Sequence, residues 1–89
     1  CGTVYYCLND DIFRKSFDTN HPNGTYPDGG CSFETYTNEN MIEVESLSEL
    51  KTVKSGEISS FTESWSLYKK PCEVDFRNDA SIDRMLEKI

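Results

Sequence analysis

Histidine is almost missing from this chain, since His21 is the single one among 89 residues. Nucleophilic catalysis needs a base beside the nucleophile, and histidine is the usual base. The sequence also contains no Gly-x-Ser-x-Gly elbow, no glycine-rich phosphate loop and no EF-hand loop. A lone histidine between Asn20 and Pro22 is typical of an exposed loop. We therefore predict no enzymatic activity, no metal site and no cofactor.

Basic residues and long apolar runs are scarce as well. Nine Lys and Arg residues stand against 16 Asp and Glu residues, which gives a net charge of −7. Nucleic acid repels such a surface unless the basic residues cluster, and Arg14-Lys15 and Lys69-Lys70 are the only basic pairs. No apolar run approaches the roughly 20 residues of a membrane span. We expect neither a nucleic-acid nor a membrane partner.

Four cysteines stand in this short chain, and no two of them form a Cys-x-x-Cys pair. An even number of cysteines in a small domain predicts two disulfide bonds and an oxidising, extracellular setting. Cys1 and Cys7 can close a short loop, whereas Cys31 and Cys72 each begin an alternating segment. We predict the pairs Cys31–Cys72 and Cys1–Cys7. Because no signal peptide is present, we expect the mature form of a secreted protein whose leader has been removed.

The chain divides at a loop rich in proline and glycine, residues 18–30. We expect an N-terminal extension over residues 1–30, with its own cysteine pair, and a core plus tail over residues 31–89. Within the extension, residues 3–6 alternate as a strand and residues 9–17 predict a helical turn. Asn23 begins an Asn-Gly-Thr sequon, which either accepts a glycan or is an unused three-residue match.

Alternation of apolar and polar residues predicts strands at residues 32–36, 41–45, 57–61, 64–69 and 72–77. Residues 47–53 fit a helical turn, a curved crossing or a strand. The tail changes period, with apolar residues at 82, 85, 86 and 89 on one face of an amphipathic helix. Trp65 shares a strand face with Leu67, which favours a core role. The expected core residues are Phe33, Ile42, Val44, Leu50, Ile58, Trp65, Leu67, Val74 and Phe76.

The segments from residue 31 to residue 77 resemble a family of fungal proteins. Cys31 opens a first strand and Cys72 begins a fifth, while GEISSF (56–61), SWSLYK (64–69) and CEVDFRN (72–78) look like that family's third to fifth strands. The family comprises the ToxB-like and avirulence proteins of plant-pathogenic fungi, called MAX effectors. The resemblance implies an all-β fold, a small disulfide-pinned six-stranded antiparallel β-sandwich. This chain departs from it by its first thirty residues and by a short C-terminal helix in place of the sixth strand.

The same resemblance implies a secreted virulence or avirulence effector that binds a host plant protein to modulate immunity. The partner would be a heavy-metal-associated-type domain or an immune receptor, met in the host apoplast or cytoplasm by a monomeric effector. In this family an exposed edge strand often extends the partner's sheet. The expected interface here is the strand Met41–Glu45, through Met41, Glu43 and Glu45, with Trp65 and Tyr68 as the next candidates.

Two other resemblances compete. GEISSF followed by WSLY is similar to a βγ-crystallin Greek key, although Ser55 and Gly56 replace the Asn/Asp pair that helps to bind calcium in that family. This alternative implies a secreted Greek-key protein. Separately, Tyr5-Tyr6-Cys7 matches the Tyr-x-Cys of mildew ribonuclease-like effectors, which implies a degenerate ribonuclease fold.

Overall fold

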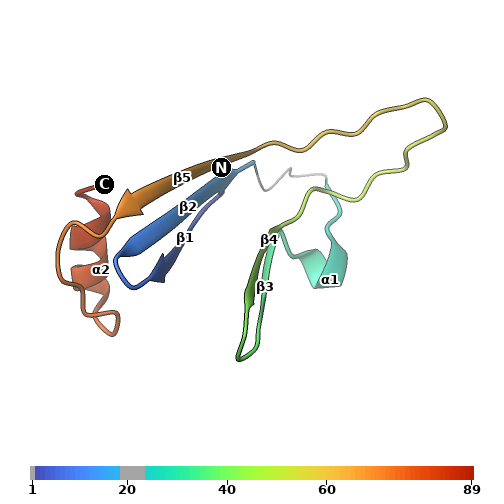
Figure 1. The fold of residues 1–89 in the computed structure, drawn as a ribbon. Helices are drawn as coiled ribbons and strands as arrows, with labels where there is room; N and C mark the ends of the chain where they lie inside the picture. The colour runs from blue at the N-terminus through green and yellow to red at the C-terminus, as the bar shows by residue number, and fades with distance from the viewer. Residues whose placement is uncertain (1, 19–23) are drawn as a thin grey trace. The chain divides into compact units, whose positions relative to one another are not determined.

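The computed structural model describes residues 2–18 and 24–89, which form two compact units. Among these residues, unit 1 contains residues 2, 16–18 and 24–63, and unit 2 contains residues 3–15 and 64–89. The described strands are β1 (Gly2–Leu8), β2 (Asp11–Phe17), β3 (Phe33–Thr37), β4 (Ile42–Ser46) and β5 (Glu63–Lys69), and the helices are α1 (Pro27–Gly30) and α2 (Asp79–Leu86). Figure 1 shows these elements along the chain. The fold is mostly β, as expected.

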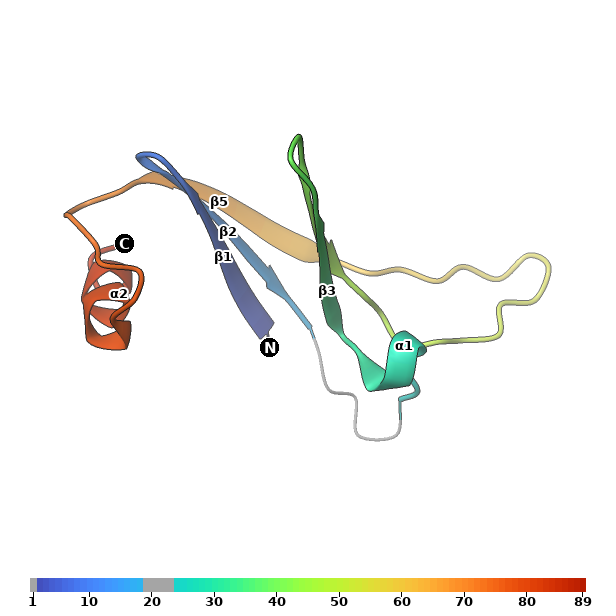
Figure 2. The same cartoon turned by 90° about the horizontal axis from the view of Figure 1, so that it is seen from below.

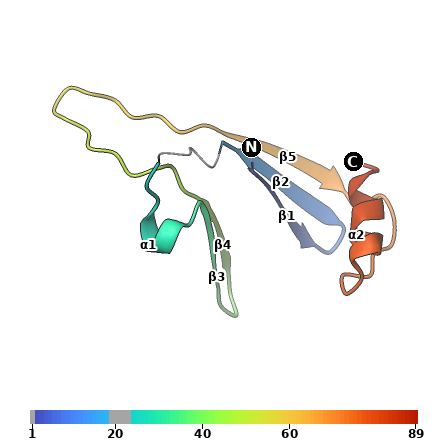
Figure 3. The same cartoon turned by 180° about the vertical axis from the view of Figure 1, so that it is seen from behind.

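Unit 2 is built on a sheet with the strand order β1-β2-β5 (Figures 1 and 3). The tight turn between β1 and β2 contains Asn9 at a φ of 53°, a left-handed conformation that asparagine tolerates better than most residues. After β5, the backbone N–H of Lys70 donates to the carbonyl of Asp10 at 2.7 Å. The predicted helical turn over residues 9–17 is therefore wrong, because the turn returns the chain as a second strand.

Helix α2 confirms the amphipathic tail that the sequence predicts. The side chain of Asn78 accepts hydrogen bonds from the backbone N–H groups of Ala80 and Ser81, at 3.0 and 3.3 Å, and so caps the helix. Met85 on this helix is buried, and so is Ile12 on β2. Both residues belong to unit 2, and theirs are the largest fully buried side chains among the described residues.

Unit 1 contains the antiparallel hairpin of β3 and β4 (Figure 2). Phe33 lies opposite Ser46 and Thr37 lies opposite Ile42, so the strands begin one residue later than predicted. The turn is held by Asn38, whose side-chain oxygen accepts from the N–H groups of Asn40 and Met41. The ring of Phe33 stacks on that of Phe17, with centroids 6.1 Å apart.

Two predicted strands are absent from the described structure. Residues 57–61 lie in an irregular segment, where Glu57 N–H donates to the carbonyl of Lys54 around Gly56 at a φ of 87°. Residues 72–77 are irregular and end in a turn at residues 76–77, and the N–H of Asp75 donates to the hydroxyl of Ser81 in α2. Alternation marks residues that could form a strand, but a strand also needs a neighbour to accept its backbone hydrogen bonds.

The expected core is largely wrong. Trp65 and Leu67 are 68% and 77% exposed, and Ile58 is 89% exposed. Leu50 and Phe76 are exposed too, whereas Phe33, Ile42, Val44 and Val74 are half-buried. The apolar side chains that are buried in the described residues are those of Ile12, Phe17 and Met85.

The described residues give five strands in two small sheets, not the expected six. Cys7, Cys31 and Cys72 are half-buried free thiols, and Cys1 lies outside the described residues. The division into residues 1–30 and 31–89 and the two cysteine pairings stay predictions.

Candidate functional site

Strand β4 is the predicted interaction strand, and it lies at the edge of a two-stranded sheet. Along it, Ile42 and Val44 are half-buried, while Glu43 and Glu45 are exposed. Met41, just before the strand, is 46% exposed. The structure thus places all three predicted contact residues, Met41, Glu43 and Glu45, at the surface of one hairpin.

The register of β3 and β4 makes the outer face of this hairpin strongly acidic. Glu34 lies directly opposite Glu45, and Tyr36 lies opposite Glu43. Like charges at opposite positions of two strands destabilise a hairpin. A hydrogen bond with Asp28 raises the pKa of the Glu34 carboxyl above its ordinary value, with smaller effects from burial and from the charges of Asp28 and Glu45. The sequence pattern does not reveal Asp28 and Glu34, because their proximity to Glu45 depends on the register and on the turn before β3.

The turn that carries Asp28 is α1, a single turn of unusual conformation. Asp28 and Gly29 have φ angles of 51° and 80°, and the N–H of Cys31 donates to the carbonyl of Pro27 at 2.9 Å. A side chain at the φ of Gly29 would be strained, so glycine suits this position. The turn leads directly into β3, which is why Asp28 can reach a carboxyl on that strand.

Strand β5 carries the second predicted contact pair, Trp65 and Tyr68, on opposite faces. The ring of Trp65 contacts Phe13 of β2 edge to face, with centroids 5.7 Å apart and planes at 76°. Tyr68 instead shares a hydrogen bond with Arg14, which lowers the pKa of the phenol. Phe13 and Arg14 are consecutive residues of β2, so their side chains lie on opposite faces of the sheet. The exposed indole lies on the same face as Phe13.

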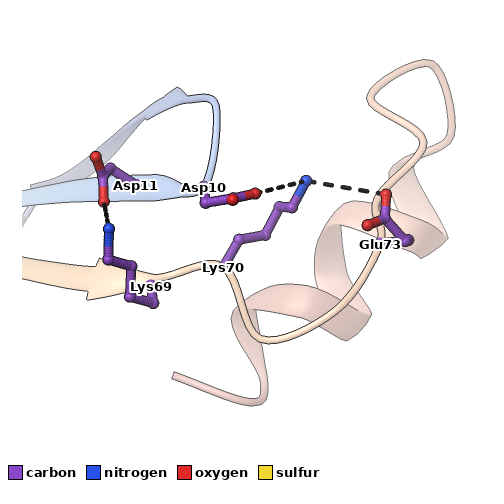
Figure 4. Close-up of polar contacts among 5 residues, drawn as sticks. All are labelled: Asp10, Asp11, Lys69, Lys70 and Glu73. Atoms are coloured by element: carbon purple, nitrogen blue, oxygen red, sulfur yellow. Dashed lines mark hydrogen bonds and ion pairs between the residues drawn. The ribbon is translucent and has the colours of Figure 1, made fainter.

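Lys70 connects the β1–β2 turn to the segment that follows β5 (Figure 4). Its ammonium lies 3.8 Å from the Asp10 carboxylate and 3.9 Å from the Glu73 carboxylate, and only 16% of its side chain is exposed. The neighbouring Lys69 forms an ion pair with Asp11 at 2.5 Å, which raises the pKa of Lys69. The Lys69-Lys70 pair is thus not a free cationic patch, because both lysines are held by carboxylates.

Cys7 lies near the same lysine. Burial raises the pKa of the Cys7 thiol, and the positive charge of Lys70 opposes that rise. Cys31 contacts the carbonyl of Asp28 through its sulfur at 3.2 Å. The sequon residue Asn23 and His21 both lie outside the described residues.

In the part of the chain that the structure describes, no three His, Cys, Asp or Glu side chains gather in a group that could hold a metal ion. The helices of that part are too short and too polar for any of them to cross a membrane. Comparison with known proteins gave no match to a family model, to a curated protein or to a solved structure.

Proposed function

We propose that this chain is a secreted fungal effector that binds a host plant protein and performs no catalysis. The observation that carries the proposal is the edge position of β4, with Glu43 and Glu45 exposed on its outer face. An edge strand can extend a partner's sheet, gaining affinity from backbone hydrogen bonds and specificity from alternate side chains. The likeness of residues 31–77 to MAX effectors supports the same role.

The chemistry of the hairpin favours a basic partner surface. Glu34, Glu43 and Glu45 share one face, and Tyr36 adds an exposed aromatic ring to it. Opposite charge speeds association and fixes the docked register. A heavy-metal-associated-type domain with a basic edge, or an immune receptor with such a domain, would fit, in the host apoplast or cytoplasm.

The acidic face also supports a monomeric effector. Charged side chains on an edge strand discourage pairing with a second copy of the same strand. The finer architecture belongs to the same proposal: a small antiparallel β fold pinned by the bond between Cys31 and Cys72. That bond would form in the oxidising setting that the four cysteines predict.

The test is capture of a partner from plant extract, followed by binding of purified heavy-metal-associated-type domains. We expect saturable binding that weakens as salt increases, because exposed charges are screened. If no plant protein binds and the gene is silent during infection, the proposal fails. A calcium titration and a ribonuclease assay on the same sample separate it from a βγ-crystallin-like protein and from a ribonuclease-like fold.

A further inference from the structure

Within unit 2, a cavity of about 360 Å³ lies where β1 faces α2 and the segment before the helix. Its walls are formed by Tyr5, Cys7, Phe76, Ile82, Met85 and Leu86. Four of these side chains are wholly apolar, and only Tyr5 and Cys7 add polar atoms. Apolar walls with a few polar groups, at roughly 300–1,000 Å³, are typical of small-molecule sites.

A cation stands beside this cavity. Arg14 is on β2, the strand next to β1, and its Nε–H is buried without a hydrogen-bond acceptor in the described structure. The hydrogen bond to Tyr68, and then the proximity of Tyr5, raise the pKa of the Arg14 guanidinium. Tyr5 therefore connects the cavity to Arg14, since it lines the cavity and neighbours the guanidinium.

Arg14 differs from Lys69 and Lys70 in its partners. Lys69 and Lys70 are held by the carboxylates of Asp11, Asp10 and Glu73, as Figure 4 shows. The groups that raise the pKa of Arg14 are phenols instead. A planar guanidinium with a buried donor matches the planar carboxylate group, which can accept two parallel hydrogen bonds from it. The charge and shape of the Arg14 guanidinium thus indicate a carboxylate at this end of the site.

We propose that unit 2 binds a small amphipathic carboxylate, with its alkyl or aryl body in the cavity and its carboxylate at Arg14. The apolar body removes Phe76, Ile82 and Leu86 from water, and the carboxylate supplies the acceptor for the buried Nε–H. Tyr5 separates the two regions and offers its phenol to the head group. The site is independent of the acidic hairpin in unit 1, so it stands whether or not that hairpin binds a host protein.

The first test compares probes on the unchanged protein. Octanoate, titrated into isotope-labelled protein, should shift the NMR signals of Tyr5, Ile82 and Leu86 saturably. Octanol has the same tail without charge and should bind at least about tenfold more weakly, because it loses the charge-assisted hydrogen bonds. Acetate and inorganic phosphate, which lack the tail, should cause no saturable shift. Equal affinity for octanol and octanoate, or saturable binding of phosphate at these residues, would overturn the proposal.

The second test uses matched variants. Arg14→Gln should weaken octanoate binding about tenfold and leave octanol binding unchanged. Arg84→Gln removes the same charge from an exposed position of α2 and should change neither affinity. Leu86→Trp should fill the cavity and abolish the binding of both probes. Helical circular dichroism checks that each variant is folded, and the octanoate–octanol comparison still decides if a variant unfolds. An Arg14→Gln protein that binds octanoate like the unchanged chain contradicts the assignment.

Discussion

The rings of Phe13 on β2 and Trp65 on β5 meet edge to face, with centroids 5.7 Å apart and planes at 76°. This contact joins two neighbouring strands on one face of the sheet. Tyr5 and Cys7 lie on the face of the sheet that is turned toward α2 and the segment before it, with the cavity between them. Arg14 and Tyr68 belong with Tyr5, which leaves Trp65 and Leu67 on the other face, in solvent.

Replacement of the indole tests which face is exposed. Trp65→Ala should lower the free energy of unfolding by about 0.5–1.5 kcal/mol, the usual value of an aromatic pair. A buried tryptophan would lose about 3–5 kcal/mol. Ile12→Ala is the matched control, since Ile12 is 0% exposed and should lose about 2–5 kcal/mol. Denaturant titrations measure both, and a larger loss at Trp65 than at Ile12 would show that the indole is core.

The sequence could predict strands only where local pattern and partner agree. Alternation in residues 41–45 and 64–69 predicted β4 and β5 to within one residue at each end. The same alternation over residues 72–77 failed, because that segment bonds to α2 and not to a neighbouring strand. Period two also cannot say which face is covered. The apolar character of Trp65 and Leu67 predicts a core position, but helix α2 covers the opposite face of the sheet.

Some of the candidate site could be predicted and some could not. Glu43 and Glu45 face outward simply because Ile42 and Val44 alternate with them, so the pattern was sufficient. Glu34 needed the hairpin register, and Asp28 needed the left-handed turn of α1. Arg14 gave no signal, because a lone arginine next to Lys15 is typical of a solvated face. Its partners Tyr5 and Tyr68 come from strands far apart in the chain.

The cap of α2 gives a local test of stability. Asn78→Ala removes the acceptor for the N–H groups of Ala80 and Ser81, and should cost about 1 kcal/mol. Asn40→Ala, in the exposed turn of the other unit, serves as the control and should change stability by less than about 0.5 kcal/mol. Thermal unfolding followed by helical circular dichroism measures the difference. Equal midpoints for the two variants would mean that Asn78 does not cap the helix.

Stability should depend on pH through Glu34. Its carboxyl holds a proton to higher pH in the folded chain than in the unfolded chain, where the pKa is about 4.3. This carboxyl favours the folded chain most below the pKa of the unfolded state. The free energy of unfolding should therefore fall as the pH rises from about 4.3 through the raised pKa of the folded state. Glu34→Gln should remove the fall and stabilise the chain at neutral pH, but not below about pH 4. If the free energy of unfolding depends on pH in the same way in both proteins, the hydrogen bond between Glu34 and Asp28 is not the cause.

The disulfide pairing is open to direct mapping. We expect Cys31 joined to Cys72 and Cys1 joined to Cys7 after oxidative folding. A bridge that closes the long loop would stabilise the chain by about 4 kcal/mol, much of the stability of a small domain. The strongest competing pair is Cys7 with Cys72, since both lie in unit 2 and Cys7 is near Lys70, which precedes Cys72 by two residues. A non-reducing peptide that links these two cysteines would replace the predicted pairing.

The acidic strand gives the decisive test of partner binding. Glu43→Lys with Glu45→Lys reverses two exposed charges and leaves the half-buried Ile42 and Val44 in place. The double variant should remain folded, because exposed substitutions seldom change stability by more than about 0.5 kcal/mol each. It should bind the captured partner at least about tenfold more weakly at low salt, and the loss should shrink at high salt.

A matched control separates charge at the strand from charge in general. Asp83→Lys with Glu87→Lys makes the same change in net charge at exposed positions of unit 2. If both double variants lose affinity equally, the partner responds to the overall negative charge and β4 is not the contact. If neither loses affinity, the exposed Trp65 face becomes the surface to test, because an aromatic contact there would need no charge. Only a loss confined to Glu43 and Glu45 assigns the interface to the edge strand.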